Sequence, residues 1–164
     1  MIVKYKYLIP ALLILGVVFS SSSAQEKVSE IKVLSAGADV ILTGKVVEQN
    51  SSWNEDQSRI YTLATVQVDE LIKGELVGNS VTVKYPGGEV GEIGEKYSHM
   101  PTFEDNEEVL VFLKQDDKST DYKVFDGENG KIRIISDQQS GEKLTTSNVK
   151  ISSLKSQIKG YIND

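Results

Sequence analysis

The stretch from Arg59 to Ile72 restricts the fold more than any other part of the sequence, because apolar and polar side chains alternate along most of it. Successive side chains of a strand point to opposite faces, so the pattern predicts a strand with one core face and one solvent face. The expected core face consists of Ile60, Thr62, Ala64, Val66 and Val68. A strand that buries one face needs a sheet around it, and the chain is therefore expected to be mainly β.

Further β-branched or apolar segments are expected to complete the sheet. Residues 39–49 predict a long strand with a bulge or bend at Gly44, and a polar loop at 50–58 joins it to the alternating strand in an antiparallel hairpin. Residues 109–113 are a continuous apolar run between charges, which predicts the most buried strand. The remaining strands are expected at 80–85, 122–125 and 131–135, with a hairpin turn over Asp126–Gly130.

Amphipathic helices are expected at both ends of the folded chain. Apolar residues at helical spacing predict a short helix over Gln25–Ala38 that stops at Gly37, and a C-terminal helix over 151–162 with Ser152 as its N-cap. The polar segment Asp137–Ser147 before that helix is expected to be mobile. Long curved hairpins with a bulge glycine, covered by helices, favour a small closed barrel over a flat sheet.

Residues 1–24 are interpreted as a signal peptide, because Lys4 and Lys6 precede an uncharged apolar run and small residues up to Ala24. The apolar run is shorter than a membrane-spanning helix requires, and an uncleaved anchor is the alternative. Residues 25–164 are expected to form one domain, secreted or periplasmic, with no stable membrane insertion after cleavage. Without Lys4 and Lys6 the 18 basic residues fall to 16 against 24 acidic ones, and the resulting charge of −8 argues against a nucleic-acid partner.

The segments Ala38–Val47, Val66–Gly74 and Glu107–Leu113 carry an alanine-aspartate start, a lysine-glycine end and a Glu-Glu strand. In this order they resemble the netrin-like modules, a superfamily that includes the tissue inhibitors of metalloproteinases. The resemblance covers residues 36–114 and implies a five-stranded barrel of the oligonucleotide/oligosaccharide-binding (OB) type with flanking helices. A closer resemblance, through Tyr85–Gly94 and the proline-x-phenylalanine ending at Phe103, is to uncharacterised exported bacterial proteins.

The chain contains no cysteine, which separates it from those inhibitors. In the inhibitors an N-terminal cysteine, on a disulfide-tied segment, chelates the catalytic metal of the peptidase through its amine and carbonyl. The expected mature N-terminus here is Gln25, so that mechanism does not carry over. Without disulfides, the core alone must stabilise the exported domain.

The only histidine, His99, and several groups of acidic residues are the candidates for chemistry. Ser98 precedes His99, but no glycine-x-serine-x-glycine elbow is present, and one histidine is a poor basis for a zinc site. The acidic groups lack EF-hand spacing and are interpreted as solvated turns, with calcium binding as the alternative. We therefore expect no catalytic residue, no metal and no cofactor, and we rank a carboxylate-based hydrolase that uses His99 last.

A surface for a partner is expected at two loops. Trp53, in the polar loop, is either an interaction residue or a cap on the barrel, with Tyr61 and Tyr97 as its expected neighbours. A glycine-rich segment from Gly87 to Gly94 is either a barrel corner or a surface that a partner approaches closely. The residues expected to form the surface are Trp53, Gly87, Gly88, Glu89, Gly91, Gly94, His99 and Phe103.

The sequence therefore favours a secreted or periplasmic, non-enzymatic binding module with an extracellular or periplasmic protein partner. The alternative is an inhibitor or regulator of an extracellular peptidase that acts by surface occlusion.

Overall fold

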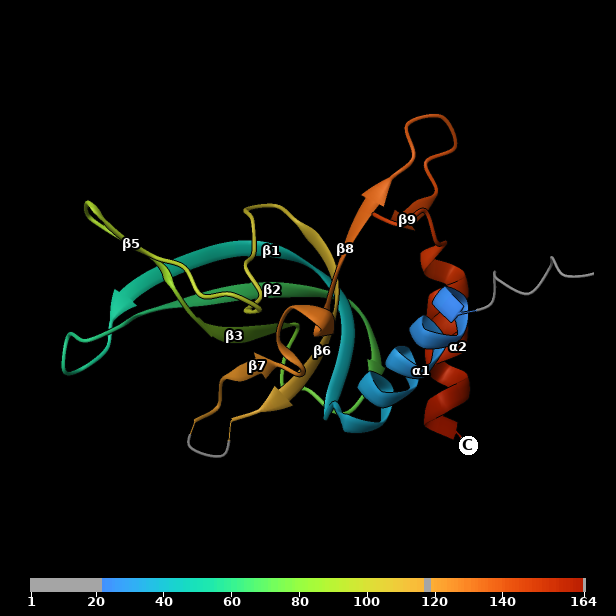
Figure 1. The fold of residues 1–164 in the computed structure, drawn as a ribbon, viewed down its shortest axis with the longest axis horizontal. Coiled ribbons are helices and arrows are strands. Elements are labelled where there is room, and N and C mark those ends of the chain that lie inside the picture. Colours follow the sequence, from blue (N-terminus) through green and yellow to red (C-terminus); the bar gives the residue numbers. More distant parts are fainter. Residues whose placement is uncertain (1–21, 117–118, 164) are drawn as a thin grey trace, which may run out of the picture.

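The computed structural model describes residues 22–116 and 119–163, and strands are its most common element (Figure 1). The longest strands, β1 (Val40–Trp53) and β2 (Ile60–Lys73), form an antiparallel hairpin. The shorter strands are β3 (Ser80–Pro86), β4 (Gly88–Val90), β5 (Ile93–Glu95), β6 (Glu108–Gln115), β7 (Tyr122–Val124), β8 (Lys131–Ser136) and β9 (Lys143–Thr145). Helices α1 (Ser22–Gly37) and α2 (Ile151–Asn163) precede and follow the strands, and a 3₁₀ helix, η1 (Gly127–Gly130), connects β7 to β8.

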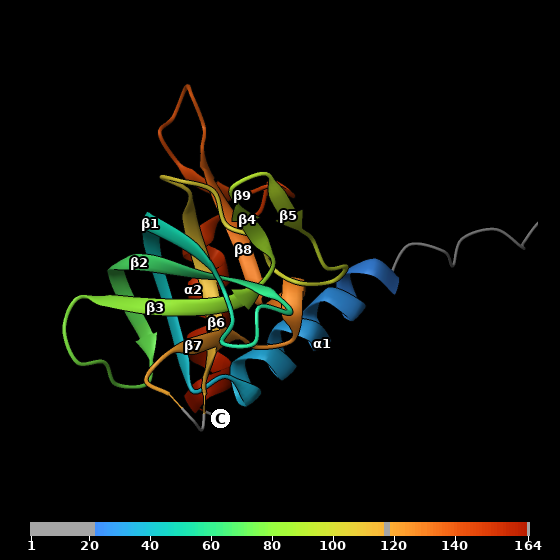
Figure 2. The same cartoon turned by 90° about the vertical axis from the view of Figure 1, so that its left-hand side faces the viewer.

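Five strands close into a barrel in the order β1-β2-β3-β7-β6, because β6 also pairs with β1. Residues 40–45 of β1 pair antiparallel with residues 108–113 of β6, and β3 meets β7 in parallel at Val83 and Tyr122. β8 and β9 extend the sheet from β6 beyond the barrel, and Figure 2 shows β1, β2 and β3 one below the other at the opposite end. The prediction of a mainly β fold with a closed five-stranded barrel and two helices is confirmed.

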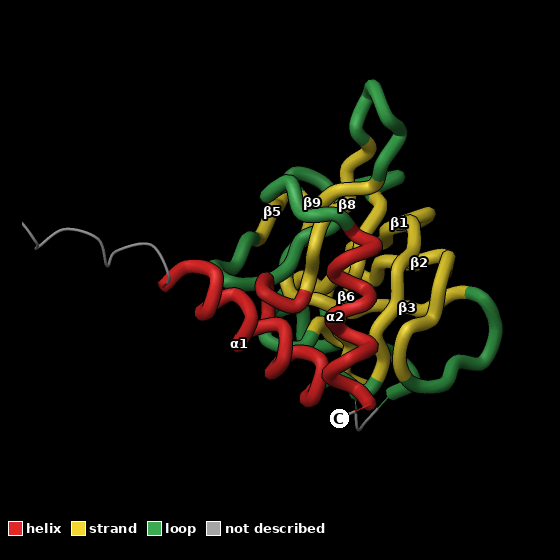
Figure 3. The backbone as a smooth tube through the Cα atoms, turned by 90° about the vertical axis from the view of Figure 1, so that its right-hand side faces the viewer, coloured by secondary structure: helices red, strands yellow, loops and turns green. Residues whose placement is uncertain are grey.

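Strand β6 is buried on both faces and separates two hydrophobic clusters. Val109, Val111 and Leu113 belong to the cluster inside the barrel, whereas Leu110 and Phe112 belong to the cluster under the helices. All five side chains have no exposed surface, which agrees with the prediction from the continuous apolar run. α1 and α2 lie side by side over the outer face of β6 (Figure 3).

Two glycines that the sequence analysis singled out are fixed by close contacts. Gly44 lies at a register shift between β1 and β2, as predicted, and a Cβ at this position would overlap the carbonyl of Gln67. Gly37 ends α1, as predicted, but without the left-handed conformation that the prediction invoked. A glycine is needed at this position because the ring of Phe125 occupies the place that a Cβ would take.

Two loop predictions at the ends of strands are wrong. Residues 50–53 are not part of a loop, since the ladder between β1 and β2 continues to Trp53 and Ile60. A ladder uses main-chain hydrogen bonds, so polar side chains do not end it. Asp126–Gly130 is not a hairpin turn, because β7 and β8 both pair with β6 rather than with each other.

Further local predictions near the C-terminus are also wrong. The segment Asp137–Ser147, for which no strand was expected, contains β9 paired with β8. Ser152 lies inside α2 rather than at its N-cap, since Leu154 N already donates to Lys150 O at 3.1 Å. The β4–β5 hairpin within the glycine-rich segment was not expected at all.

Residues 1–21 of the expected signal peptide lie outside the described residues. None of the helices in the described ranges has the length and apolarity that a membrane crossing requires.

Candidate functional site

The β4–β5 hairpin lies against the β1–β2 ladder at the end of the barrel far from the helices (Figure 1). Gly87 N donates to the carbonyl of Ile60 at 2.8 Å, and Thr62 Oγ1 donates to the carbonyl of Gly87 at 2.7 Å. The Thr62 hydroxyl also lies 2.8 Å from the Ser51 hydroxyl. Hydrogen bonds therefore hold the glycine-rich segment to the barrel.

Three of the four clustered glycines have a local structural reason. Gly87, Gly88 and Gly91 have positive φ, a conformation that side-chain-bearing residues rarely adopt. A Cβ on Gly88 would overlap the Thr62 hydroxyl, and one on Gly87 would lie 2.8 Å from the Glu95 carbonyl. Gly91 is the first of two turn residues between β4 and β5, as in a type II′ turn. Gly94 has ordinary φ and room for a Cβ, so the fold does not require a glycine there.

Polar contacts also fix the end of β5 to the start of β2. Glu95 Oε2 accepts hydrogen bonds from Ile60 N at 3.0 Å and from the Tyr97 hydroxyl at 2.9 Å. The bond to Glu95 raises the pKa of Tyr97, because the carboxylate favours the protonated hydroxyl. The Arg59 guanidinium lies 6.0 Å from the centre of the Tyr97 ring, at the outer limit of a cation–π contact.

A hollow of about 430 Å³ opens beside Tyr61, where β3 and β7 share only a short contact. The ammonium of Lys84 lies 5.0 Å from the centre of the Tyr61 ring, which places a cation on an aromatic face at the rim. Met100, which is 41% exposed, also lines the hollow. The hollow thus offers aromatic, thioether and cationic groups to a ligand.

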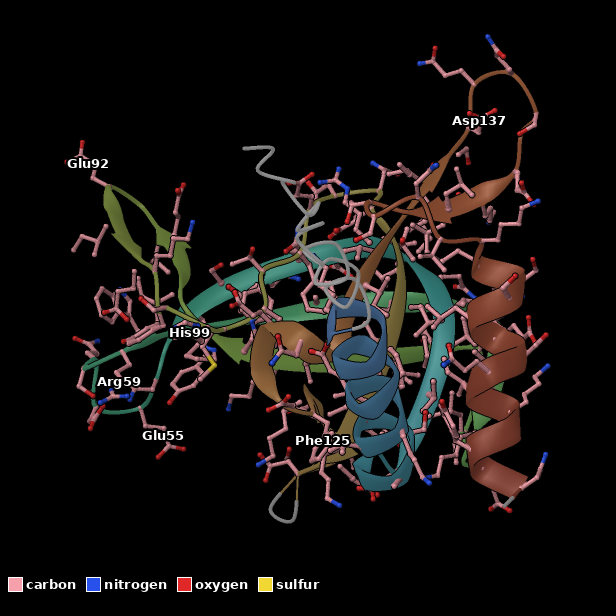
Figure 4. The ribbon with its side chains drawn as sticks, turned by 45° about the vertical axis from the view of Figure 1, so that its right-hand side comes forward. Glu55, Arg59, Glu92, His99, Phe125 and Asp137 are labelled. Carbon is pink, nitrogen blue, oxygen red and sulfur yellow. The ribbon has the colours of Figure 1, made fainter. Side chains whose placement is uncertain are left out.

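Trp53, the only tryptophan, is the last residue of β1 and is half-buried. Its strand partner is Ile60, whose main chain binds both Gly87 and Glu95. Trp53, Arg59, Tyr61, Lys84 and Tyr97 therefore lie at one end of the barrel, with Trp53 and Tyr61 on opposite faces of the β1–β2 ladder, and we call this group the aromatic end. Figure 4 shows Arg59 at this end, with Glu92 at the tip of the β4–β5 hairpin.

The other expected surface residues are divided between the surface and the interior. Glu89 is exposed on β4. Phe103 and Gly87 are buried, so the expectation that they contact a partner is corrected. The Phe103 ring packs 5.5 Å from that of Tyr85, so it shapes this end of the barrel from inside.

His99 lies between the aromatic end and η1 (Figure 4). Its side chain is 87% exposed, and its Nδ1 lies 3.3 Å from Glu128 Oε1. The His99 carbonyl accepts a hydrogen bond from Glu128 N at 3.1 Å, which fastens the loop to η1. Within residues 22–116 and 119–163, no three histidine, aspartate or glutamate side chains are grouped so that they could hold a metal ion.

The sequence analysis missed a buried ion pair behind this end. Glu107, with a side chain only 2% exposed, accepts hydrogen bonds from Lys131 at 2.8 Å and from Glu104 N at 3.0 Å. The Lys131 ammonium also donates to the carbonyl of Thr102 and lies 4.8 Å from the centre of the Phe103 ring. No signal marks this pair, because Glu107 stands among acidic residues typical of a solvated turn.

Comparison with models of known protein families and with curated protein sequences gives no match to this chain. The functional argument therefore depends on the geometry of the molecule itself.

Proposed function

We propose that the protein is an exported, non-enzymatic binding module that holds a protein partner through its aromatic end. The observation that supports this proposal is that Trp53, Tyr61 and Tyr97, all half-buried, lie at one end of the barrel, with Arg59 and Lys84 near the Tyr97 and Tyr61 rings. Tyrosine, tryptophan and arginine are the residues most enriched at the energetic centres of protein interfaces. A rigid aromatic side chain also loses little conformational entropy when a partner covers it.

The arrangement of this end supports binding by preformed contacts. Trp53 and Tyr61 stand on the paired strands β1 and β2, and the Tyr97 hydroxyl is bonded to Glu95, so these aromatic side chains have a fixed support rather than a free loop. Preorganisation reduces the ordering cost of association. The resemblance to netrin-like modules supports a binding function of the same kind. A barrel of this type without cysteine lacks the metal-chelating N-terminus, but its loops can still contact a partner.

Site-specific photo-crosslinking tests the proposal. A photoreactive phenylalanine in place of Tyr61 is expected to form an adduct with one protein of the exported fraction of the producing cells. The matched control is the same replacement at Tyr161 on α2, which is also half-buried and has the Lys32 ammonium 6.0 Å from its ring centre. The Trp53→Ala and Tyr97→Ala changes should each reduce the Tyr61 adduct.

Equal adducts from positions 61 and 161 would contradict the proposal, because they would show that neither end of the molecule is preferred. Adducts unchanged by Trp53→Ala and Tyr97→Ala would contradict it as well. A partner that proves to be a peptidase whose activity falls on binding would make the module a regulator acting by surface occlusion.

A further inference from the structure

Strand β1 is paired along both edges over its first half and along one edge over its second half. Residues 40–45 pair with β6 on one side, and residues 41–53 pair with β2 on the other. Val46 still donates to the Glu107 carbonyl at 2.9 Å and accepts from Asn106 N at 3.0 Å. Beyond a register shift between Val46 and Glu48, the structure gives no strand partner for this edge among the described residues.

Main-chain groups of Gln49, Ser51 and Trp53 point to the open edge. Asn54 N donates to the Arg59 carbonyl at 2.9 Å. Hydrogen-bonded and non-hydrogen-bonded pairs alternate along an antiparallel ladder, so the pairs Ser52–Tyr61 and Asn50–Leu63 are hydrogen-bonded as well. The main-chain groups of the β1 residues between these positions therefore face away from β2. Ile60, the partner of Trp53, confirms the alternation, since its N–H and carbonyl bind Glu95 and Gly87 on the β3 side. Three donors and three acceptors therefore lie in a row without a protein partner in the described chain.

The β4–β5 hairpin stands beside this edge. Ser51 lies directly under Gly88, whose Cβ would be 3.0 Å from the Ser51 Cβ. β4 contacts both β1 and β2, so the hairpin lies over one face of the ladder next to this edge. Ile93, near its tip, is 53% exposed. A strand added to β1 would thus meet main-chain groups along its length, with the hairpin over one face of the ladder.

Acidic side chains flank the same edge. Asp105 Oδ1 accepts a hydrogen bond from Gln49 Nε2 at 2.9 Å, and Glu48 Oε1 accepts one from Asn50 Nδ2 at 2.9 Å. Both acids are exposed, and the whole chain carries a net charge of −6. This charge favours a basic partner strand and disfavours the edge of a second copy, because like charges placed opposite each other on neighbouring strands repel.

We propose that the open edge of β1, from Gln49 to Trp53, binds an extended, lysine- or arginine-bearing segment of a partner protein as an additional strand. The inference deepens the proposed function and rests on it, since the edge ends at the aromatic end. Main-chain hydrogen bonds supply the pairing, as in other cases of strand addition. Trp53 supplies an apolar contact, and Glu48 and Asp105 select basic side chains.

Hydrogen exchange on the unliganded protein is the first test. The amides of Asn50 and Ser52 are expected to exchange slowly, because they donate within the β1–β2 ladder, whereas those of Ser51 and Trp53 exchange at least tenfold faster. Equal protection of all four amides would overturn the proposal, since it would show that the edge is already covered. A dimer by sedimentation with this equal protection would identify a second copy as the occupant.

Binding of peptides selected from a random twelve-residue display library is the second test. Selected peptides are expected to be rich in lysine and arginine, and to slow exchange at Ser51 and Trp53 while leaving Asn50 and Ser52 unchanged. N-methylation of every second peptide amide, either the odd-numbered or the even-numbered ones, removes the N–H groups on one edge of the peptide strand. One of these two patterns should weaken binding at least tenfold. Selection of no peptide, or of peptides that bind equally well when methylated in either pattern, would overturn the proposal.

Two variants at Ser51 distinguish the contribution of the main chain to binding from that of the side chain. Ser51→Pro removes an outward N–H and should abolish peptide binding, whereas Ser51→Ala keeps the N–H and removes only the hydroxyl contact with Thr62. Equal binding by both variants would contradict strand addition. If Ser51→Pro does not fold, the methylated peptides give the same answer on the unmodified protein. Failure of strand addition leaves the Tyr61 crosslink intact, so the two proposals fail separately.

Discussion

Replacing Gly88 by alanine is expected to release the β4–β5 hairpin and to lower the free energy of unfolding by about 3 kcal/mol. Gly88 has a φ of 125°, and a Cβ there would overlap the hydroxyl groups of Thr62 and Ser51. The change therefore acts on the backbone conformation and on the packing at the same time.

The structure sets both the size and the upper limit of this loss. Backbone strain at such a φ costs about 1–3 kcal/mol, and overpacking adds about 1–3 kcal/mol. The hairpin escapes both if it detaches, which breaks the bonds from Gly87 N to Ile60, from Thr62 to Gly87 and from Ile60 N to Glu95. At about 1 kcal/mol for each bond, detachment limits the loss to about 3 kcal/mol.

Urea unfolding followed by two probes measures the effect. Trp53 fluorescence reports on the end of the barrel to which the hairpin is bound, and far-ultraviolet circular dichroism reports on the whole fold. A detached hairpin should shift the Trp53 emission to longer wavelength before urea is added. Gly94→Ala is the matched control, because Gly94 has ordinary φ and room for a Cβ, and its stability should change by less than about 1 kcal/mol.

Equal stability of the Gly88→Ala and Gly94→Ala variants would refute the reasoning. It would show that neither the positive φ nor the Ser51–Thr62 contact constrains the hairpin. A large loss in Gly94→Ala together with an unaffected Gly88→Ala would refute it too, since it would reverse the order that the contacts require.

Two further predictions concern charged groups. Glu107→Ala should destabilise the fold by about 3–5 kcal/mol in urea unfolding, because it leaves the charge of Lys131 without its buried partner. Loss of the exposed Glu104 carboxylate should cost no more than about 1 kcal/mol. Equal effects of the two changes would contradict the argument from burial. Hydrogen bonds from Lys155 and Lys159 lower the pKa of Glu70 below its usual 4.5. The Glu70 carboxylate therefore stabilises the fold above pH 4.5, and this contribution is lost as the pH falls through the lowered pKa. The stability of Glu70→Gln, measured by thermal unfolding, should accordingly fall less than that of the unchanged protein over this acidic range, and parallel pH curves would contradict the assignment.

The barrel itself was predictable because its strands carry strong side-chain patterns. The alternation from Ile60 to Val66 marks the face that is buried, and the apolar run 109–113 marks the strand that is buried on both sides. The β4–β5 hairpin was not predictable in this way. Each of its strands has three residues, and its position depends on contacts with Ser51 and Thr62 that have no pattern in the sequence.

The candidate site was predictable in part for a similar reason. Trp53 and the glycines stand out by residue type, but the sequence gives Phe103 the same weight as an exposed aromatic, and only packing against Tyr85 shows that it is buried. The ion pair of Glu107 joins the acidic turn to β8, and its partner Lys131 is 24 positions later in the chain. Distance along the sequence, rather than an unusual residue type, hides such a pair.

The double burial of β6 has a consequence for the smallest unit that can fold. Because Leu110 and Phe112 need the helices while Val109 and Val111 need the barrel, neither half can be removed without exposing the strand that both halves share. Truncation of the chain before α2 would remove Ile151, Leu154 and Ile158 from the cluster under the helices and expose part of that cluster to solvent, which favours association of truncated copies over an independent smaller barrel. The barrel and its helices should therefore unfold in a single cooperative transition.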